Sequence, residues 1–124
     1  MEVILTPDAP TPRGHYSQAI VHNGLVYVSG ILPIDISGNK LTHDSLETQT
    51  AQVLSNLNAI LKAAGSEPAK VLKTTVYITD VNHWGRVNTM YAAFFGEHRP
   101  ARSIVPIKEL HFGLQIELEA IASL

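Results

Sequence analysis

The chain has 124 residues, a formal net charge of −2 and a pI near 6.3, with 45% hydrophobic and 16% charged residues. This length fits one compact domain, which we expect to span residues 1–124. The slightly acidic balance argues against a dedicated nucleic-acid-binding protein, because such a protein usually carries a basic patch. The absence of cysteine excludes disulfides, thiolate metal ligands and a cysteine nucleophile.

Neither a membrane segment nor an export signal is apparent in the sequence. No apolar run approaches the roughly 20 residues that are needed to span a bilayer. The first residues, Met1-Glu2-Val3-Ile4, lack both a basic region and a long apolar region, so no secretory signal is expected. The expected compartment is therefore the cytoplasm.

The first predicted elements form a β-hairpin. Residues 17–21 and 25–29 are rich in β-forming side chains, and they flank the pair Asn23-Gly24. Asn-Gly favours the positive φ angles of a two-residue hairpin turn, so this pair is the clearest local signal in the chain. A polar loop over residues 35–44 follows.

The next element is a predicted helix from about Ser45 to Ala64. Apolar residues recur at helical spacing between residues 46 and 61. Asp44 with Glu47 resembles a capping box at the start, and Gly65 supplies a stop.

A strand and a second helix follow. Residues 71–79 are rich in β-forming residues and predict a strand. Apolar residues return to helical spacing between residues 81 and 95, and Gly96 ends that run. The alternation of element types indicates an α+β protein.

Two closing strands are predicted at residues 101–107 and 114–122. Proline cannot donate a hydrogen bond to a neighbouring strand. Pro106 therefore places the first of these two strands at a sheet edge or a bulge.

The second face of the predicted sheet is also partly apolar. In the last strand, Leu114, Ile116, Leu118 and Ala120 alternate with Gln115, Glu117, Glu119 and Ile121. Two earlier strands also carry apolar residues on both faces. In one, Val26 and Val28 lie on one face and Leu25 and Tyr27 on the other. In the other, Val76 and Ile78 lie on one face and Val71 and Tyr77 on the other. Two helices can cover only one face of such a sheet. Since a large apolar patch seldom faces water, we expect the second face to be buried against other subunits.

Common catalytic motifs are absent. The sequence has no P-loop, no dinucleotide glycine motif, no G-x-S-x-G and no H-E-x-x-H. None of the six histidines forms a close-spaced ligand pair, so no metal site is expected and most are interpreted as surface or turn residues. The six are His15, His22, His43, His83, His98 and His111.

Arg102 is the first candidate for a functional role because it lies inside a predicted strand. A guanidinium is planar and permanently charged, and it can hold a carboxylate through two hydrogen bonds. Glu117 is the matching acidic candidate in the last strand. From spacing alone, a structural ion pair between the two, or two solvated side chains, is the simpler interpretation.

Three further positions have an ordinary and a functional interpretation. Tyr16 precedes the hairpin and is by itself a packing residue. Ser29-Gly30 could simply end a strand, or allow a ligand to approach the backbone closely. Asn88 could lie on a solvated helix face.

Several segments together resemble the RidA/YjgF family of reactive-intermediate deaminases over essentially the whole chain. The segments are Gly14-His15-Tyr16-Ser17-Gln18-Ala19, Val28-Ser29-Gly30, Lys73-Thr74-Thr75-Val76-Tyr77, Val87-Asn88-Thr89-Met90-Tyr91, Pro100-Ala101-Arg102-Ser103 and Ile116-Glu117-Leu118-Glu119-Ala120-Ile121-Ala122. The resemblance implies a chorismate-mutase-like fold with a mixed six-stranded sheet and two helices on one face. It also implies a homotrimer with sites between subunits.

The activity implied by the resemblance is cofactor-independent hydrolysis of 2-enamine or 2-imine acids, such as 2-aminoacrylate, to 2-keto acids and ammonia. Arg102 would bind the substrate carboxylate, and Glu117 would orient or deprotonate water. Other residues would line the cleft: Tyr16, Ser29, Gly30, Asn88 and the backbone of Ile104. No metal or membrane partner is implied, and a nucleic-acid partner is not expected.

Four positions depart from the family pattern. His15 and His111 stand where proline is usual, Ile31 replaces a common glutamine, and Ile104 replaces a cysteine found in some members. Ile31 is expected to make the pocket more apolar. Two alternative functions stay open: a non-catalytic small-carboxylate-binding or chaperone-like trimer, and an endoribonuclease, which the acidic charge disfavours.

Overall fold

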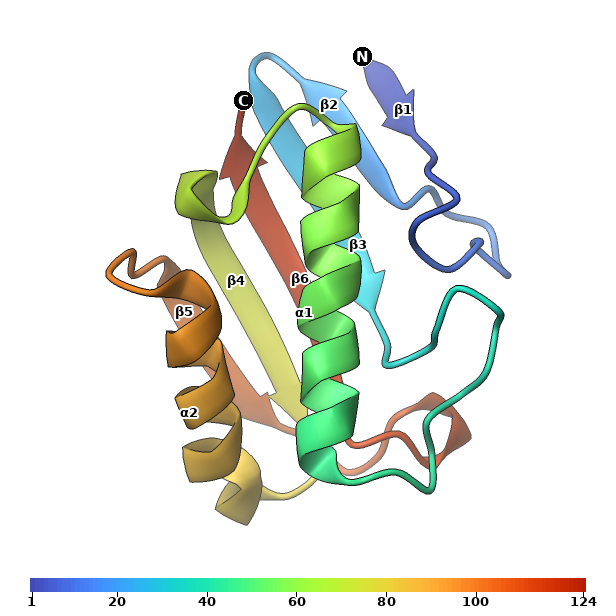
Figure 1. Ribbon diagram of the computed structural model, residues 1–124, viewed down its shortest axis with the longest axis vertical. Helices are drawn as coiled ribbons and strands as arrows, with labels where there is room; N and C mark the ends of the chain where they lie inside the picture. The colour runs from blue at the N-terminus through green and yellow to red at the C-terminus, as the bar shows by residue number, and fades with distance from the viewer.

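A computed structural model describes all residues from 1 to 124 (Figure 1). Its strands and helices are β1 (Glu2–Ile4), β2 (Ala19–His22), β3 (Leu25–Ile31), α1 (Leu46–Ala63), β4 (Val71–Ile78), α2 (Trp84–Phe95), β5 (Ala101–Pro106) and β6 (Ile116–Ser123). Short 3₁₀ turns occupy Pro68–Lys70, Val81–His83 and His111–Gly113. None of the helices is long and apolar enough to span a membrane.

The six strands form one mixed sheet in the order β1-β2-β3-β6-β4-β5. Strands β4 and β5 are parallel, with α2 as the crossover between them, and all other neighbours are antiparallel. Both helices cover the same face of the sheet (Figure 1). The predicted α+β fold with two helices on one face is therefore confirmed. Pro106 does lie on an edge strand, whereas the short opposite edge strand β1 was not located from the sequence.

The predicted hairpin is confirmed, with its turn at Asn23-Gly24. Their φ angles are +51° and +76°, as a two-residue hairpin turn of this kind requires. His22 pairs with Leu25 across the turn, which fixes the register of β2 against β3.

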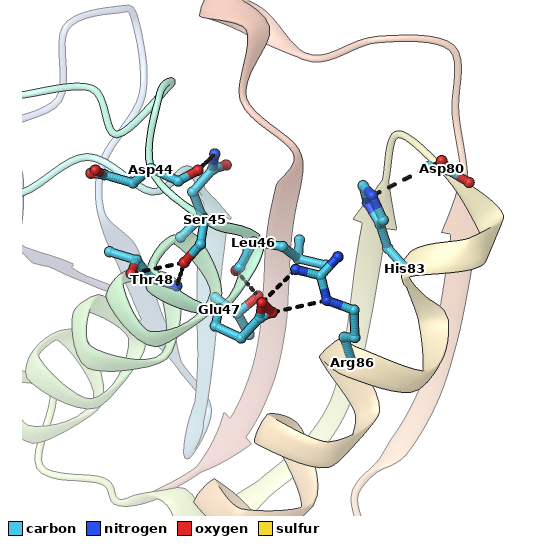
Figure 2. Close-up of polar contacts among 10 residues, drawn as sticks. Asp44, Ser45, Leu46, Glu47, Thr48, Asp80, His83 and Arg86 are labelled. Carbon is cyan, nitrogen blue, oxygen red and sulfur yellow. Dashed lines mark hydrogen bonds and ion pairs between the residues drawn. The ribbon is translucent and has the colours of Figure 1, made fainter.

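The start of α1 differs in detail from the prediction. Ser45, not Asp44, is the N-cap, and its hydroxyl accepts a hydrogen bond from the backbone N–H of Thr48. Glu47 does not close a capping box with Asp44. It instead accepts two hydrogen bonds from Arg86 of α2 and so joins the two helices (Figure 2).

The hydrophobic core fills the space between the sheet and the two helices. The alternation of β6 is confirmed, because Ile116, Leu118, Ala120 and Ala122 are buried while the residues between them are partly exposed. Opposite them, α1 contributes Val53, Leu54, Leu57, Ile60 and Leu61, and α2 contributes Val87, Tyr91 and Phe95.

A β-bulge at the start of β4 makes the predicted facing of Val71 wrong. We expected Val71 on the second face of the sheet. It pairs with Ala122 and Lys73 pairs with Ile121, so β4 has one extra residue at this point. The bulge turns Val71 into the core and leaves Leu72 exposed instead.

Candidate functional site

The two principal site candidates lie on opposite faces of the sheet. Glu117 alternates with the buried Ile116 and Leu118, so it projects from the face that no helix covers. Arg102 pairs in register with Thr74, which is buried beneath the helices. The intramolecular ion pair between Arg102 and Glu117 that the spacing allowed is therefore absent from the structure.

Arg102 is held against α2 by one hydrogen bond and two aromatic rings. Its Nη1 donates to Oδ1 of Asn88 at 2.9 Å. Its Cζ lies 4.7 Å from the ring centre of Tyr91 and 5.8 Å from that of Trp84, within the range of cation–π attraction. Ile104 follows on the same face of β5 and is half-buried. We call Arg102, Asn88, Tyr91 and Trp84 the Arg102 clamp.

The inner wall of the Arg102 clamp is fixed by a buried hydrogen bond. The hydroxyls of Tyr91 and Thr74 lie 2.7 Å apart, and both side chains are buried. Burial raises the pKa of the Tyr91 phenol, while the hydrogen bond to Thr74 and the charge of Arg102 lower it, and the net shift is upward. Tyr91 therefore stays neutral at physiological pH.

The guanidinium of Arg102 retains capacity for a ligand. Five N–H donors are available on an arginine, and the structure assigns one of them to Asn88. No carboxylate of the chain pairs with Arg102. A planar, half-buried guanidinium with free donors is suited to bind a small carboxylate through two hydrogen bonds.

The second group of candidates surrounds Glu117 on the open face. A bulge in β3 between Val28 and Ile31 places Gly30 against the Glu117 carboxyl group. A Cβ atom on Gly30 would lie 3.1 Å from Cδ and Oε2 of Glu117. Gly30 thus makes room for the Glu117 side chain, and close approach of a ligand to its backbone stays a prediction.

The surroundings of Glu117 raise the pKa of its carboxyl group. Burial is the largest cause, since it disfavours the charged form. His111 lowers the pKa by its charge, and Glu119 raises it. Glu119 also accepts a hydrogen bond of 3.0 Å from the hydroxyl of Tyr77, the residue directly opposite Glu117 on β4.

A cleft of about 800 Å³ opens beside Glu117, and we call it the Glu117 cleft. Tyr16, Ser29 and Gly30 line it, together with the loop that follows β3. The Ser29 hydroxyl donates a 2.6 Å hydrogen bond to the carbonyl of Ser17, which ties the segment after Tyr16 to β3. Of the sequence candidates, Tyr16, Ser29, Gly30 and Glu117 are thus brought together, while Asn88, Arg102 and Ile104 form a separate group.

Ile31 lies in the wall of the cleft, although it is only 6% exposed and its side chain packs in the core. That it makes the cleft more apolar stays a prediction. The more exposed apolar residues of the cleft are Tyr16, Ile36 and Phe112. Phe112 has a φ of +62°, and the cationic Nζ of Lys40 lies 4.3 Å from its ring centre.

Trp84 and Tyr91, the aromatic residues beside Arg102, are not among the site residues predicted from the sequence. Together with Asn88 they are spaced four and three residues apart, so they lie on one helix face. In the predicted second helix they count only as part of the apolar periodicity. A signal existed in this spacing, but it could not reveal that β5 would present Arg102 to that face.

The structure brings together no group of three or more histidine, aspartate or glutamate side chains able to hold a metal ion. The polar groups of both sites are instead a guanidinium, carboxyls and hydroxyls. This donor set suits recognition of a small organic acid.

Known proteins resemble the chain along almost its full length. The profile of the family described as endoribonuclease L-PSP matches residues 6–124. RutC family protein PH0854 of Pyrococcus horikoshii is 44% identical over 121 residues, which are 98% of this chain and 96% of that protein. A Rattus norvegicus protein named 2-iminobutanoate/2-iminopropanoate deaminase is 41% identical over 121 residues, 98% of this chain and 88% of its own. The structure of E. coli TdcF with bound serine has a TM-score of 0.94 at 34% identity and covers 100% of this chain and 99% of that one.

Proposed function

Because the chain belongs to the endoribonuclease L-PSP family, which includes the RidA deaminases, we propose that it hydrolyses reactive 2-enamine and 2-imine acids to 2-keto acids and ammonia. The observation that supports the proposal is the presence of the Arg102 clamp, with its free N–H donors, and of the Glu117 cleft on a chain similar to a protein named as an imine deaminase. We treat these two features as the half-sites of the proposed active site. The whole of residues 1–124 forms one domain in this proposal.

The reaction needs little from the protein beyond positioning and one proton acceptor. A 2-enamine acid tautomerises to the imine, whose C2 carbon is already electrophilic. Water adds to C2, the C–N bond then breaks, and ammonia leaves as the C2 carbonyl forms. Glu117 accepts a proton from the attacking water and passes it to the imine nitrogen. It then carries the proton of the new hydroxyl group to the departing amine as the C2 carbonyl forms. A single acid/base group of this kind contributes about 10²–10⁴-fold.

In this proposal Arg102 binds the carboxylate that all such substrates share. Its free N–H donors provide the two-point contact, and Asn88 holds the guanidinium in place. Tyr16, Ser29 and Gly30 line the space for the rest of the substrate. The backbone of Ile104, on the same strand as Arg102, would border that space from the neighbouring subunit. The solved relative TdcF holds serine, a molecule with the same carboxylate and C2 nitrogen, which supports a small 2-amino-acid-like substrate class.

The separation of the half-sites requires a second subunit. Strand β5 lies two strands from β6, about 10 Å away, and the two side chains project from opposite faces. A substrate of a few heavy atoms cannot contact both groups of one chain. We therefore propose a homotrimer in which Arg102 of one subunit faces the Glu117 cleft of its neighbour, with the half-apolar open face buried between subunits.

An endoribonuclease function is not favoured by the cleft. Glu117 and Glu119 place two carboxyl groups beside each other in it, so the cleft offers an RNA phosphate backbone no continuous basic surface, although Arg13 and Lys40 also line it. A protein that only binds small carboxylates would need the Arg102 clamp but has no evident use for a half-buried Glu117.

A coupled assay tests the proposal. A threonine or serine dehydratase releases the enamine, and keto-acid formation is followed with and without the purified protein. We expect acceleration over spontaneous hydrolysis at low micromolar protein. Keto-acid formation at the uncatalysed rate, with a folded protein that still binds keto acids, would leave only the carboxylate-binding alternative.

A further inference from the structure

Three residues of α2 face Arg102 from one side of the helix. Trp84, Asn88 and Tyr91 follow one another at intervals of four and three residues, which places them on a common stripe. Asn88 contributes a hydrogen bond to the guanidinium, and the two aromatic residues contribute their rings. All three side chains of this stripe therefore interact with the same guanidinium group.

The two rings differ in how firmly they are held. Trp84 is 47% exposed and its indole makes no hydrogen bond, so no polar contact fixes its orientation. Tyr91 is only 7% exposed, and its hydroxyl shares a 2.7 Å hydrogen bond with the buried Thr74. Tyr91 is the nearer ring to the cation and the one whose orientation the core fixes.

Thr74 is itself the direct neighbour of Arg102 in the β4–β5 ladder. The Tyr91–Thr74 hydrogen bond thus connects the ring beneath the guanidinium to the strand position beside it. A shift of the Tyr91 side chain by rotation about χ1 would break this bond inside the core, where neither hydroxyl has water as a substitute partner. The position of the ring against which Arg102 rests is consequently held by two buried residues.

We propose that Tyr91 is a positioning residue for substrate-carboxylate binding, and that its hydrogen bond to Thr74 holds in place the ring against which Arg102 presents its free donors. This inference rests on the proposed function, which supplies the substrate carboxylate that Arg102 binds. Bidentate recognition depends on the orientation of the guanidinium as much as on its charge, so loss of the bond lowers carboxylate affinity.

Three variants separate positioning from simple stability. Tyr91→Phe keeps the ring and removes its hydroxyl, leaving the Thr74 hydroxyl unpaired in the core. The double variant Tyr91→Phe/Thr74→Val removes both partners, which recovers much of the stability that an unpaired buried group costs. Thr50→Val is the matched control, because Thr50 is an equally buried threonine whose hydroxyl bonds the Leu46 carbonyl in α1, away from the Arg102 clamp.

The measurements are the dissociation constant of a 2-keto acid by titration calorimetry, KM and kcat in the coupled assay, and the melting temperature. We expect Tyr91→Phe to weaken keto-acid binding and raise KM about three- to tenfold, with kcat changed less than twofold. The double variant should regain melting temperature without regaining affinity. Thr50→Val should bind the keto acid like the unmodified protein.

The proposal is overturned if Tyr91→Phe binds keto acid normally, or if affinity returns with stability in the double variant. No keto-acid binding by the unmodified protein would overturn it as well, together with the carboxylate role of Arg102. Normal binding without any turnover in the unmodified protein would refute only the deaminase function, and the affinity comparison among variants would still decide the role of Tyr91.

Discussion

The Glu117 carboxyl group is subject to two opposing demands. Burial raises its pKa, so the charged form is disfavoured in the folded chain. A general base must nevertheless lose its proton at the working pH. His111 lowers the pKa and Glu119 raises it, so the pH at which Glu117 ionises depends on the charges around the cleft.

Replacing Glu117 by Gln should separate activity from stability. The amide cannot take a proton, so we expect kcat to fall by about 10²-fold or more while keto-acid binding persists. The raised pKa means that the folded state holds this proton more tightly than the unfolded state, so ionisation destabilises the fold as pH rises through the pKa of the folded state. Glu117→Gln should therefore melt higher than the unmodified protein at pH 7, and the gap should close below about pH 4.

The same assignment predicts a pH profile. In the unmodified protein, kcat/KM should fall as the pH drops through the raised pKa of Glu117, because protonation removes the base. A Glu117→Gln protein with near-normal kcat would remove Glu117 from the acid/base role.

Gly30 is expected to be necessary for the position of that carboxyl group. In Gly30→Ala the new methyl carbon would lie 3.1 Å from Cδ and Oε2 of Glu117, and the flexible side chain would have to move aside. The fold should survive, but kcat/KM should fall about tenfold or more, because misplaced catalytic groups are costly. Gly85→Ala is the control, since a Cβ there meets nothing within 4 Å. Equal activity in the two variants would contradict the role given to Gly30.

Substitutions of Arg102 test whether substrate binding depends on the planar geometry of the guanidinium as well as on its charge. Lysine keeps the charge but loses the planar fork. A charge-assisted hydrogen bond is worth about 1.5–3 kcal/mol, so Arg102→Lys should lose one to two decades in kcat/KM, and Arg102→Ala nearly all activity. Both should retain the fold, as judged by thermal melting on the same preparations. An Arg102→Lys protein that is less stable yet fully active would refute the catalytic assignment.

The candidate residues themselves could be named from the sequence, but their arrangement could not. From type and strand position alone, a structural ion pair or two solvated side chains was the simpler interpretation of Arg102 and Glu117, and their roles in carboxylate binding and acid/base chemistry came from the resemblance to the RidA/YjgF family. That they project from opposite faces depends on the parallel pairing of β5 with β4, a long-range register. The burial of Ile31 depends likewise on the bulge in β3.

At the scale of elements, the start of α1 shows that several neighbouring polar residues can suit a helix N-terminus while only one of them caps it. Asp44, Ser45 and Glu47 all suit a helix N-terminus. The structure uses the Ser45 hydroxyl, and Glu47 is engaged by Arg86 instead (Figure 2). The choice follows from where the preceding loop places the first helical residue.

This choice gives a stability prediction. Ser45→Ala should lower the free energy of unfolding by about 1 kcal/mol, because it leaves the Thr48 N–H without its side-chain acceptor. Asp44→Ala should cost clearly less, since the Asp44 side chain does not cap the helix. Denaturant unfolding of both variants measures the difference, with kcat/KM expected to be unchanged. A larger loss in Asp44→Ala would restore the capping role assigned from the sequence.

The sequence predicted the longer elements well for identifiable reasons. Asn23-Gly24 carries its own turn geometry, and both helices have apolar periodicity with a glycine after the end. Strand β1 has only three residues and no alternation long enough to recognise. The bulge that buries Val71 arises from pairing with β6 and leaves no mark in the local sequence.

At the scale of the whole molecule, the proposed site is divided between two surfaces of the chain, so a complete site requires two subunits to assemble. One chain provides an Arg102 clamp at the β5 edge and a Glu117 cleft on the open face. Around a closed ring of three identical chains, each clamp can meet the cleft of the next chain. Every site would then depend on two subunits, and each subunit would serve two sites.

Such shared sites predict complementation between two inactive proteins. Co-expression of Arg102→Ala and Glu117→Gln subunits should give mixed trimers in which some sites combine an intact Arg102 with an intact Glu117. With equal amounts and random assembly, about a quarter of the sites should be active. Each variant expressed alone should be inactive, and sedimentation should give about three times the 13.5 kDa chain mass for all preparations. If each site lay within one chain, the mixture would be as inactive as its components, and a monomeric mass would remove the shared-site arrangement altogether.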